Sequence, residues 1–96
     1  MGPEATIERT ICKEARAAGW LERKLKFLSI RGAPDRIFGR AGVTVLIEFK
    51  PRDGHARRQQ LKRHRELREE FGLRVEMCHS VHEGRAILDL PKEKEI

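Results

Sequence analysis

Three side chains that could hydrolyse a phosphate ester stand around one apolar run of the sequence. The run, residues 43–47, is preceded by Asp35 and followed by Glu48, Phe49 and Lys50. Side chains alternate between the two faces of a strand, so Glu48 and Lys50 point to one side and Phe49 to the other. Asp35, at the start of the partner strand, can reach the side of Glu48 and Lys50. We therefore expect two carboxylates and an ammonium group to converge.

This set of groups is suited to metal-dependent hydrolysis. Cleaving a phosphodiester requires an activated water and stabilisation of developing negative charge, and a bound Mg²⁺ supplies both. Hard cations prefer oxygen ligands, which Asp35, Glu48 and the backbone carbonyl of Phe49 offer. Lys50 could orient or deprotonate the water, or stabilise charge on the phosphate. The pattern predicts a metal-dependent hydrolytic site, although an exposed Glu and Lys at a strand end are also common surface residues.

A hairpin is expected to position these groups. Residues 43–47 are β-branched and apolar with turn residues on both sides, which indicates a buried strand. Residues 36–38 form a shorter partner strand, and residues 39–42, with a glycine at each end, supply the connection.

Before the hairpin we expect a helix and then a strand. Residues 4–18 have helical apolar spacing and end at Gly19. Glu8 lies at the border of that apolar stripe, where a solvated surface position is the simpler interpretation. The following strand lies between Gly19 and the turn at Arg31 and Gly32. The apolar positions expected in the core are Ile7, Ile11, Ala15 and Ala18 in the helix and Leu21, Leu25 and Phe27 in the strand.

After the hairpin, residues 51–55 form a loop and residues 56–71 a long helix that Gly72 terminates. Its basic residues are densest at its start, next to the loop that follows Lys50. A strand over residues 73–78 and a short helix from Ser80 or Val81 to Pro91 complete the chain. The expected buried stripe of the long helix is Gln60, His64, Leu67 and Phe71, widened by Leu61. The order helix, strand, strand, strand, helix, strand, helix predicts an α/β or α+β fold with helices against a sheet.

The composition indicates one soluble, basic domain. The 96 residues are 38% charged and 39% hydrophobic, which fits a single globular domain over residues 1–96 with a frayed tail at 91–96. A net charge of +6 suggests a polyanionic partner such as nucleic acid. No apolar segment is long enough to span a bilayer, and no signal peptide is visible. Cys12 and Cys78 have no disulfide-framework spacing, which favours a reduced, cytoplasmic setting.

The residues around the hairpin resemble a known nuclease signature. Pro34 and Asp35, followed by Glu48, Phe49 and Lys50 at the end of the next strand, look like the PD-(D/E)xK motif. More narrowly, residues 32–35 (GAPD), residues 47–50 (IEFK) and a following helix with Gln60 and His64 resemble the VRR-NUC (virus-type replication-repair nuclease) family. The resemblance extends from Ile7 to about Leu88. It implies a restriction-endonuclease-like core, a mixed central sheet flanked by helices.

The resemblance also implies roles for individual residues. Asp35, Glu48 and the Phe49 carbonyl would bind Mg²⁺, for which Mn²⁺ could substitute, and Lys50 would be the catalytic lysine. Glu8 would match an acidic residue of the first helix that approaches the metal, as a catalytic residue and a further candidate ligand. A glutamine at the start of the long helix would lie near the active site. The apolar stripe favours Gln60 for this role, and the adjacent Gln59 stays the alternative.

Standalone members of this family resemble structure-selective endonucleases that cut four-way (Holliday) junctions as homodimers. A symmetric dimer would suit a symmetric junction, and pairing would stabilise a small domain. We therefore expect a DNA partner, no membrane, and a cytoplasmic location in a bacterial or virus-infected host cell. The number of metal ions and the preferred DNA structure stay open. The expected DNA-binding residues are Lys24, Lys26, Arg31, Arg36, Arg52, Arg57, Arg58 and Lys62.

The sequence also offers three alternatives to the endonuclease. The first is a non-catalytic nucleic-acid-binding module that kept the fold and the basic face, although Asp35, Glu48 and Lys50 are all present. The second is an interaction subunit of a repair complex, which would need an exposed apolar patch. The third is a zinc site at Cys78, His79 and His82, whose spacing matches no common zinc pattern.

Overall fold

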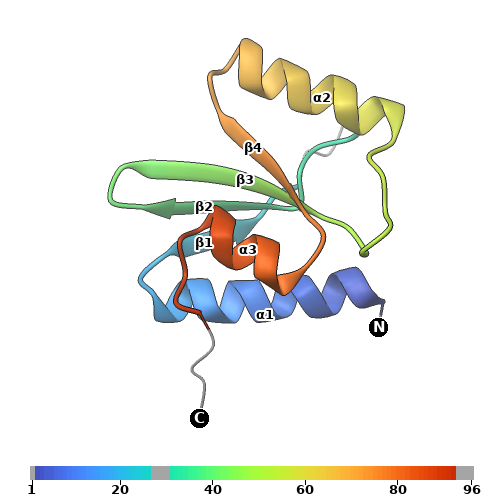
Figure 1. Ribbon diagram of the computed structural model, residues 1–96. Coiled ribbons are helices and arrows are strands. Elements are labelled where there is room, and N and C mark those ends of the chain that lie inside the picture. The colour runs from blue at the N-terminus through green and yellow to red at the C-terminus, as the bar shows by residue number, and fades with distance from the viewer. Residues whose placement is uncertain (1, 27–30, 93–96) are drawn as a thin grey trace.

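The structure, a computed structural model, describes residues 2–26 and 31–92 and arranges them as a four-stranded sheet between helices (Figure 1). The expected order of helices and strands is confirmed, as is the α+β class. The elements are α1 (Pro3–Ala17), β1 (Leu21–Lys24), β2 (Arg36–Arg40), β3 (Val43–Phe49), α2 (Arg58–Glu69), β4 (Arg74–Cys78) and α3 (Val81–Ile87).

The sheet is mixed, with the strands in the order β1-β2-β3-β4. Strands β1, β2 and β3 are antiparallel neighbours, whereas β4 runs parallel to β3. The predicted connection over residues 39–42 is wrong in length, because Gly39 and Arg40 belong to β2. The turn is the pair Ala41 and Gly42, whose φ angles are 49° and 83°. Positive φ at both central positions is typical of a type I′ hairpin turn, which lets Arg40 pair with Val43 directly beside the turn.

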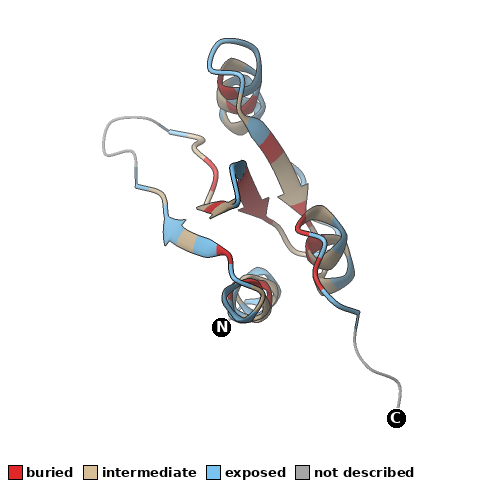
Figure 2. Cartoon of the chain, turned by 90° about the vertical axis from the view of Figure 1, so that its left-hand side faces the viewer, coloured by how far each residue is buried: buried red, intermediate tan, exposed pale blue. Residues whose placement is uncertain are grey.

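The helices cover opposite faces of the sheet. Helix α2 packs on one face against β4, and α1 and α3 pack together on the other (Figure 1). Alternate residues of β3 serve the two faces: Val45, Ile47 and Phe49 join the core under α1 and α3, whereas Leu46 joins Leu67 of α2. Figure 2 shows the buried residues gathered in the centre of the sheet. Glu48 and Lys50 continue the Leu46 side of the strand, which is the α2 side.

The apolar stripe predicted for the first helix is confirmed. Ile11 and Ala15 are fully buried, and Ile7 and Ala18 are partly buried against the same core. Helix α3 approaches α1 closely at Gly84, where an added Cβ would lie 2.5 Å from the Ile11 side chain. This close contact closes the face of the sheet opposite the carboxylates.

Three apolar residues predicted to be buried are exposed: Leu21 (57%), Leu61 (53%) and Phe71 (66%). Phe71 lies beyond the end of α2, so the helical periodicity no longer applies to it. Leu21 lies on an edge strand that α2 does not contact. Leu61 lies at the edge of the side of α2 that His64 and Leu67 bury. Leu25 is partly buried in the core under α2, and the prediction for Phe27 falls outside the described residues.

Candidate active site

The strand register places Asp35 beside Glu48. Arg36 pairs with Ile47 across the β2–β3 ladder, so Asp35, one residue earlier, stands opposite Glu48. The backbone continues the ladder there, because the Asp35 N–H donates to the Ile47 carbonyl at 3.0 Å. The Asp35 side chain is fixed as well, since its Oδ2 accepts a hydrogen bond from the Phe49 N–H at 2.8 Å. Two carboxylates therefore face each other at the end of the hairpin.

Glu48 is the most buried charged residue of this pair, with 5% of its surface exposed. Its Oε2 atom accepts a hydrogen bond from Gln60 Nε2 at 3.1 Å and lies 3.6 Å from Lys50 Nζ. Its Oε1 atom is buried and has no hydrogen-bond partner among the described residues. A buried oxygen without a donor costs free energy, so this atom is suited to a ligand that supplies positive charge.

The cap of α2 orients Gln60 toward Glu48. Gln60 is the third residue of the helix, and its Oε1 accepts a hydrogen bond from the N–H of the N-cap residue Arg57 at 2.9 Å. This contact is one half of a capping box, and it leaves the amide Nε2 free to donate to Glu48. Gln59 is exposed and lines the same cleft. The structure therefore assigns the contact with Glu48 to Gln60, as the apolar stripe predicted.

Gly32 lets the turn before Asp35 lie directly against the start of α2. Its φ angle is +86°, and an added Cβ would lie 2.5 Å from the Gln59 carbonyl oxygen and 2.9 Å from the Gln60 nitrogen. Sequence reasoning gave this glycine no role in the site, although its place three residues before the aspartate was a signal. The turn and the helix enclose a cleft of about 330 Å³ lined by Arg31, Gly32, Ala33, Asp35, Glu48, Arg57, Gln59 and Gln60.

Burial disfavours the negative charge of both carboxylates. Burial raises the pKa of Asp35, while the hydrogen bond from the Phe49 N–H opposes the rise. Burial and then the neighbouring Asp35 raise the pKa of Glu48 to about 7, against the opposing effects of Lys50 and Gln60. A cation between the two carboxylates would favour their charged forms and offset this cost.

The residues present fit a divalent oxygen-preferring cation. They offer carboxylate oxygens from Glu48 of β3 and from Asp35 directly before β2, including the buried Oε1 of Glu48 that has no partner in the described structure. Across residues 2–26 and 31–92, no three His, Cys, Asp or Glu side chains gather to hold a metal. Cys78, His79 and His82 form no such group in that part of the chain. Mg²⁺ characteristically keeps several waters, so a site with two carboxylates suits it.

Glu8 does not line this cleft. Its carboxylate accepts a hydrogen bond from Arg36 Nε at 2.5 Å, and Arg36 also bonds Glu22 of β1 at 2.5 Å. Glu8 and Arg36 border a separate cleft of about 310 Å³ between α1 and the sheet. Glu8 is nevertheless near enough for its charge to contribute to the raised pKa of Asp35. The guanidinium of Arg36 is engaged by two carboxylates, which does not suit the DNA-binding role expected from the sequence.

The other basic residues named from the sequence lie on the surface. Arg31 and Arg57 line the carboxylate cleft, and Arg58 and Lys62 are exposed on α2. Lys24, Lys26 and Arg52 are also exposed.

His64 lies one turn after Gln60 and is buried, as the apolar stripe predicted. Neither ring nitrogen has a hydrogen-bond partner within the described residues. Burial lowers the pKa of His64 to about 4, assisted by the charges of Arg68 and Lys50. The imidazole is therefore neutral near pH 7.

Comparison with solved structures shows a likeness to a known fold. A solved structure described as a VRR_NUC domain superposes on 93% of this chain and 97% of its own length, with a TM-score of 0.82 and 24% sequence identity. The chain therefore has the fold of a VRR_NUC domain, as the residues around the hairpin predicted. No protein-family model matches the sequence, and no curated protein matches it. Among the described residues, no helix has the length and apolar character needed to cross a membrane.

Proposed function

We propose that this chain is a Mg²⁺-dependent, structure-selective DNA endonuclease that cuts four-way junctions as a homodimer. The observation that carries the proposal is the pairing of Asp35 with Glu48, whose Oε1 has no partner among the described residues, next to Lys50 and Gln60. The likeness to a solved VRR_NUC domain supports a nuclease-type fold around these residues. Mn²⁺ would substitute for Mg²⁺, because both accept carboxylate oxygens.

In this proposal the chain's own residues divide the work of phosphodiester hydrolysis. Asp35, Glu48 and the Phe49 carbonyl would hold the metal ion, which when bound lowers the pKa of water and neutralises charge on the phosphate. Lys50, 3.6 Å from the Glu48 carboxylate, would orient the attacking water or bind a phosphate oxygen. Gln60 would fix the Glu48 carboxylate through its 3.1 Å hydrogen bond. Glu8 would act from the neighbouring cleft through its charge, which adds to burial in raising the pKa of Asp35, and would not bind the metal directly.

The arrangement of charge supports DNA as the substrate. The chain carries a net charge of +6, and Arg31 and Arg57 lie in the wall of the carboxylate cleft. These residues would contact the phosphates on either side of the cleaved bond, since phosphate contacts position a nucleic acid without reading its sequence. The remaining surface set is Lys24, Lys26, Arg52, Arg58 and Lys62.

A cleavage assay on labelled DNA tests the proposal. Wild-type protein with Mg²⁺ should cut a four-way junction in preference to linear duplex, and the Lys50→Ala variant should bind the junction without cutting it. Protein that binds the junction and leaves it intact with both Mg²⁺ and Mn²⁺ would refute the enzyme and indicate a binding module. Sedimentation of the protein alone tests the homodimer separately.

A further inference from the structure

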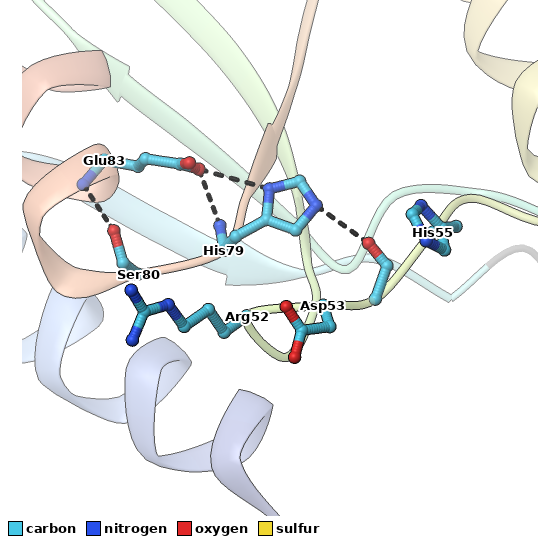
Figure 3. A pocket seen from close by; sticks show the side chains of 7 residues that line it. Arg52, Asp53, His55, His79, Ser80 and Glu83 are labelled. Atoms are coloured by element: carbon cyan, nitrogen blue, oxygen red, sulfur yellow. Dashed lines mark hydrogen bonds and ion pairs between the residues drawn. The ribbon is translucent and has the colours of Figure 1, made fainter.

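The loop that joins Lys50 to Gln60 is tied to the end of β4 by one histidine. His79 follows β4, and its Nε2 lies 3.0 Å from the carbonyl oxygen of Gly54 in this loop (Figure 3). Its Nδ1 lies 3.2 Å from the carboxylate of Glu83 in α3. Glu83 is fixed in turn, because its Oε2 accepts from the His79 N–H at 2.8 Å and its own N–H donates to Ser80 Oγ at 3.0 Å.

The loop segment that His79 contacts is a tight turn. The Gly54 N–H donates to the Pro51 carbonyl at 2.8 Å. An added Cβ on Gly54 would lie 2.8 Å from the Pro51 ring, so the turn leaves no room for a side chain at this position. The turn and His79 border an open cleft of about 660 Å³ (Figure 3).

Both partners of the imidazole accept hydrogen bonds only, since one is a carboxylate and the other a peptide carbonyl. Nε2 must therefore carry the proton of its hydrogen bond to the Gly54 carbonyl. His79 thus links α3 to the turn and serves as a clamp between them, which differs from the role of zinc ligand.

The clamped loop connects two residues of the carboxylate cleft. Its first end is fixed at Lys50, whose N–H donates to the Cys78 carbonyl at 2.9 Å, directly before His79. Its second end leads into the cap of α2 that orients Gln60. A change in the path of the loop would shift these two residues, whereas Asp35 and Glu48 are held by the strands.

We propose that His79 is a positioning residue for catalysis, acting through its Nε2–H bond to the Gly54 carbonyl. This inference rests on the proposed nuclease function. Loss of that bond lets the turn move relative to β4, which misplaces Lys50 and Gln60 without removing a group that contacts DNA or metal. A misplacement of about 1 Å can reduce a catalytic rate by about 100-fold.

Two substitutions with the same functional group test this contact. An asparagine amide reaches about as far as Nδ1 of histidine, and a glutamine amide about as far as Nε2. His79→Asn should keep the bond to Glu83 and lose the bond to Gly54, and its kcat should fall about 10- to 100-fold with the KM for junction DNA unchanged. His79→Gln should restore the bond to Gly54 and most of kcat. Equal kcat in His79→Asn and wild type, or equal loss in both variants, would overturn the proposal.

Amide hydrogen exchange provides a readout that does not depend on activity. The Gly54 amide should exchange faster in His79→Asn than in wild type and His79→Gln, while the amides of β3 keep their protection. If wild-type protein does not cut DNA, the proposed function fails, and the exchange rates still decide whether His79 fixes the turn. Unchanged Gly54 exchange in His79→Asn would refute the clamp itself.

Discussion

Replacing Gly32 by alanine should separate the two walls of the carboxylate cleft. The new Cβ would lie 2.5 Å from the Gln59 carbonyl oxygen and 2.8 Å from its carbonyl carbon, both backbone atoms of α2. Backbone atoms cannot rotate away as a flexible side chain could. The N-terminal end of α2 must therefore move away from the loop that precedes Asp35.

Two separate costs determine the size of the effect. The φ angle of +86° is unfavourable for alanine by about 1–2 kcal/mol. Overpacking against backbone adds about 1–3 kcal/mol. The free energy of unfolding of Gly32→Ala should therefore fall by about 2–5 kcal/mol. A shift of about 0.5–1 Å in α2 would also lengthen the 3.1 Å bond from Gln60 to Glu48 and, if the nuclease proposal holds, reduce cleavage by about 100-fold.

Gly42 provides a matched control for the backbone cost. Its φ angle is +83°, nearly that of Gly32, but no atom lies within 4 Å of an added Cβ. Gly42→Ala should lose only about 1–2 kcal/mol in chemical denaturation and keep wild-type cleavage of junction DNA. The difference between the two variants measures the close approach at Gly32. If they are equally stable and equally active, the argument that Gly32 sets the cleft is refuted.

Three further predictions concern charge. Glu48→Gln should stabilise the metal-free protein at pH 8 and change its stability little at pH 4. The reason is that the folded pKa of Glu48, about 7, lies above its ordinary value of 4.5. The wild type therefore loses stability as the pH rises from about 4.5 through 7 and Glu48 becomes charged. A pH-independent effect in denaturation would contradict this. The folded pKa of His64, about 4, makes the wild type lose stability as the pH falls from 6.5 to 4. His64→Leu should remove this loss of stability. Identical acid-unfolding curves for the variant and the wild type would count against it. DNA affinity should fall steeply with salt, and the Arg57→Ala, Arg58→Ala double variant should reduce the slope of log K against log salt by about 2; a flat salt dependence would exclude phosphate contacts.

The hairpin was predictable because its signals are local. The β-branched run at residues 43–47 indicates a strand whatever surrounds it, and alternation then places Glu48 and Lys50 on one face. The exact register depends on the turn. Because only Ala41 and Gly42 form it, Asp35 stands directly opposite Glu48, a pairing that the longer expected connection did not define.

Contacts between distant charged residues could not be predicted in the same way. The sequence shows that Arg36 is basic but not that Glu8 and Glu22, 28 and 14 residues away, accept its hydrogen bonds. Such partners depend on how α1 lies across the sheet. For the same reason the sequence alone predicts a DNA-binding role for Arg36 and a metal-binding role for Glu8.

Helical periodicity predicted the buried side of α2 only in the middle of the helix. His64 and Leu67 are buried as expected, whereas Phe71 is exposed because the helix ends at Glu69. Periodicity predicts which side a residue occupies but not whether another element covers that side. The choice of Gln60 over Gln59 became definite only through the cap at Arg57.

The two-residue turn of the hairpin has a consequence for the order of folding. Asp35 and Glu48 lie at the open end of the hairpin and come together as its strands pair outward from this short turn, so little chain entropy opposes each step. Gln60 reaches Glu48 only after α2 docks, and the parallel pairing of β4 with β3 needs a much longer loop to close. We therefore expect the carboxylate pair to form in an early hairpin and to repel until α2 arrives. Divalent cations added during refolding should then accelerate the step in which this hairpin forms.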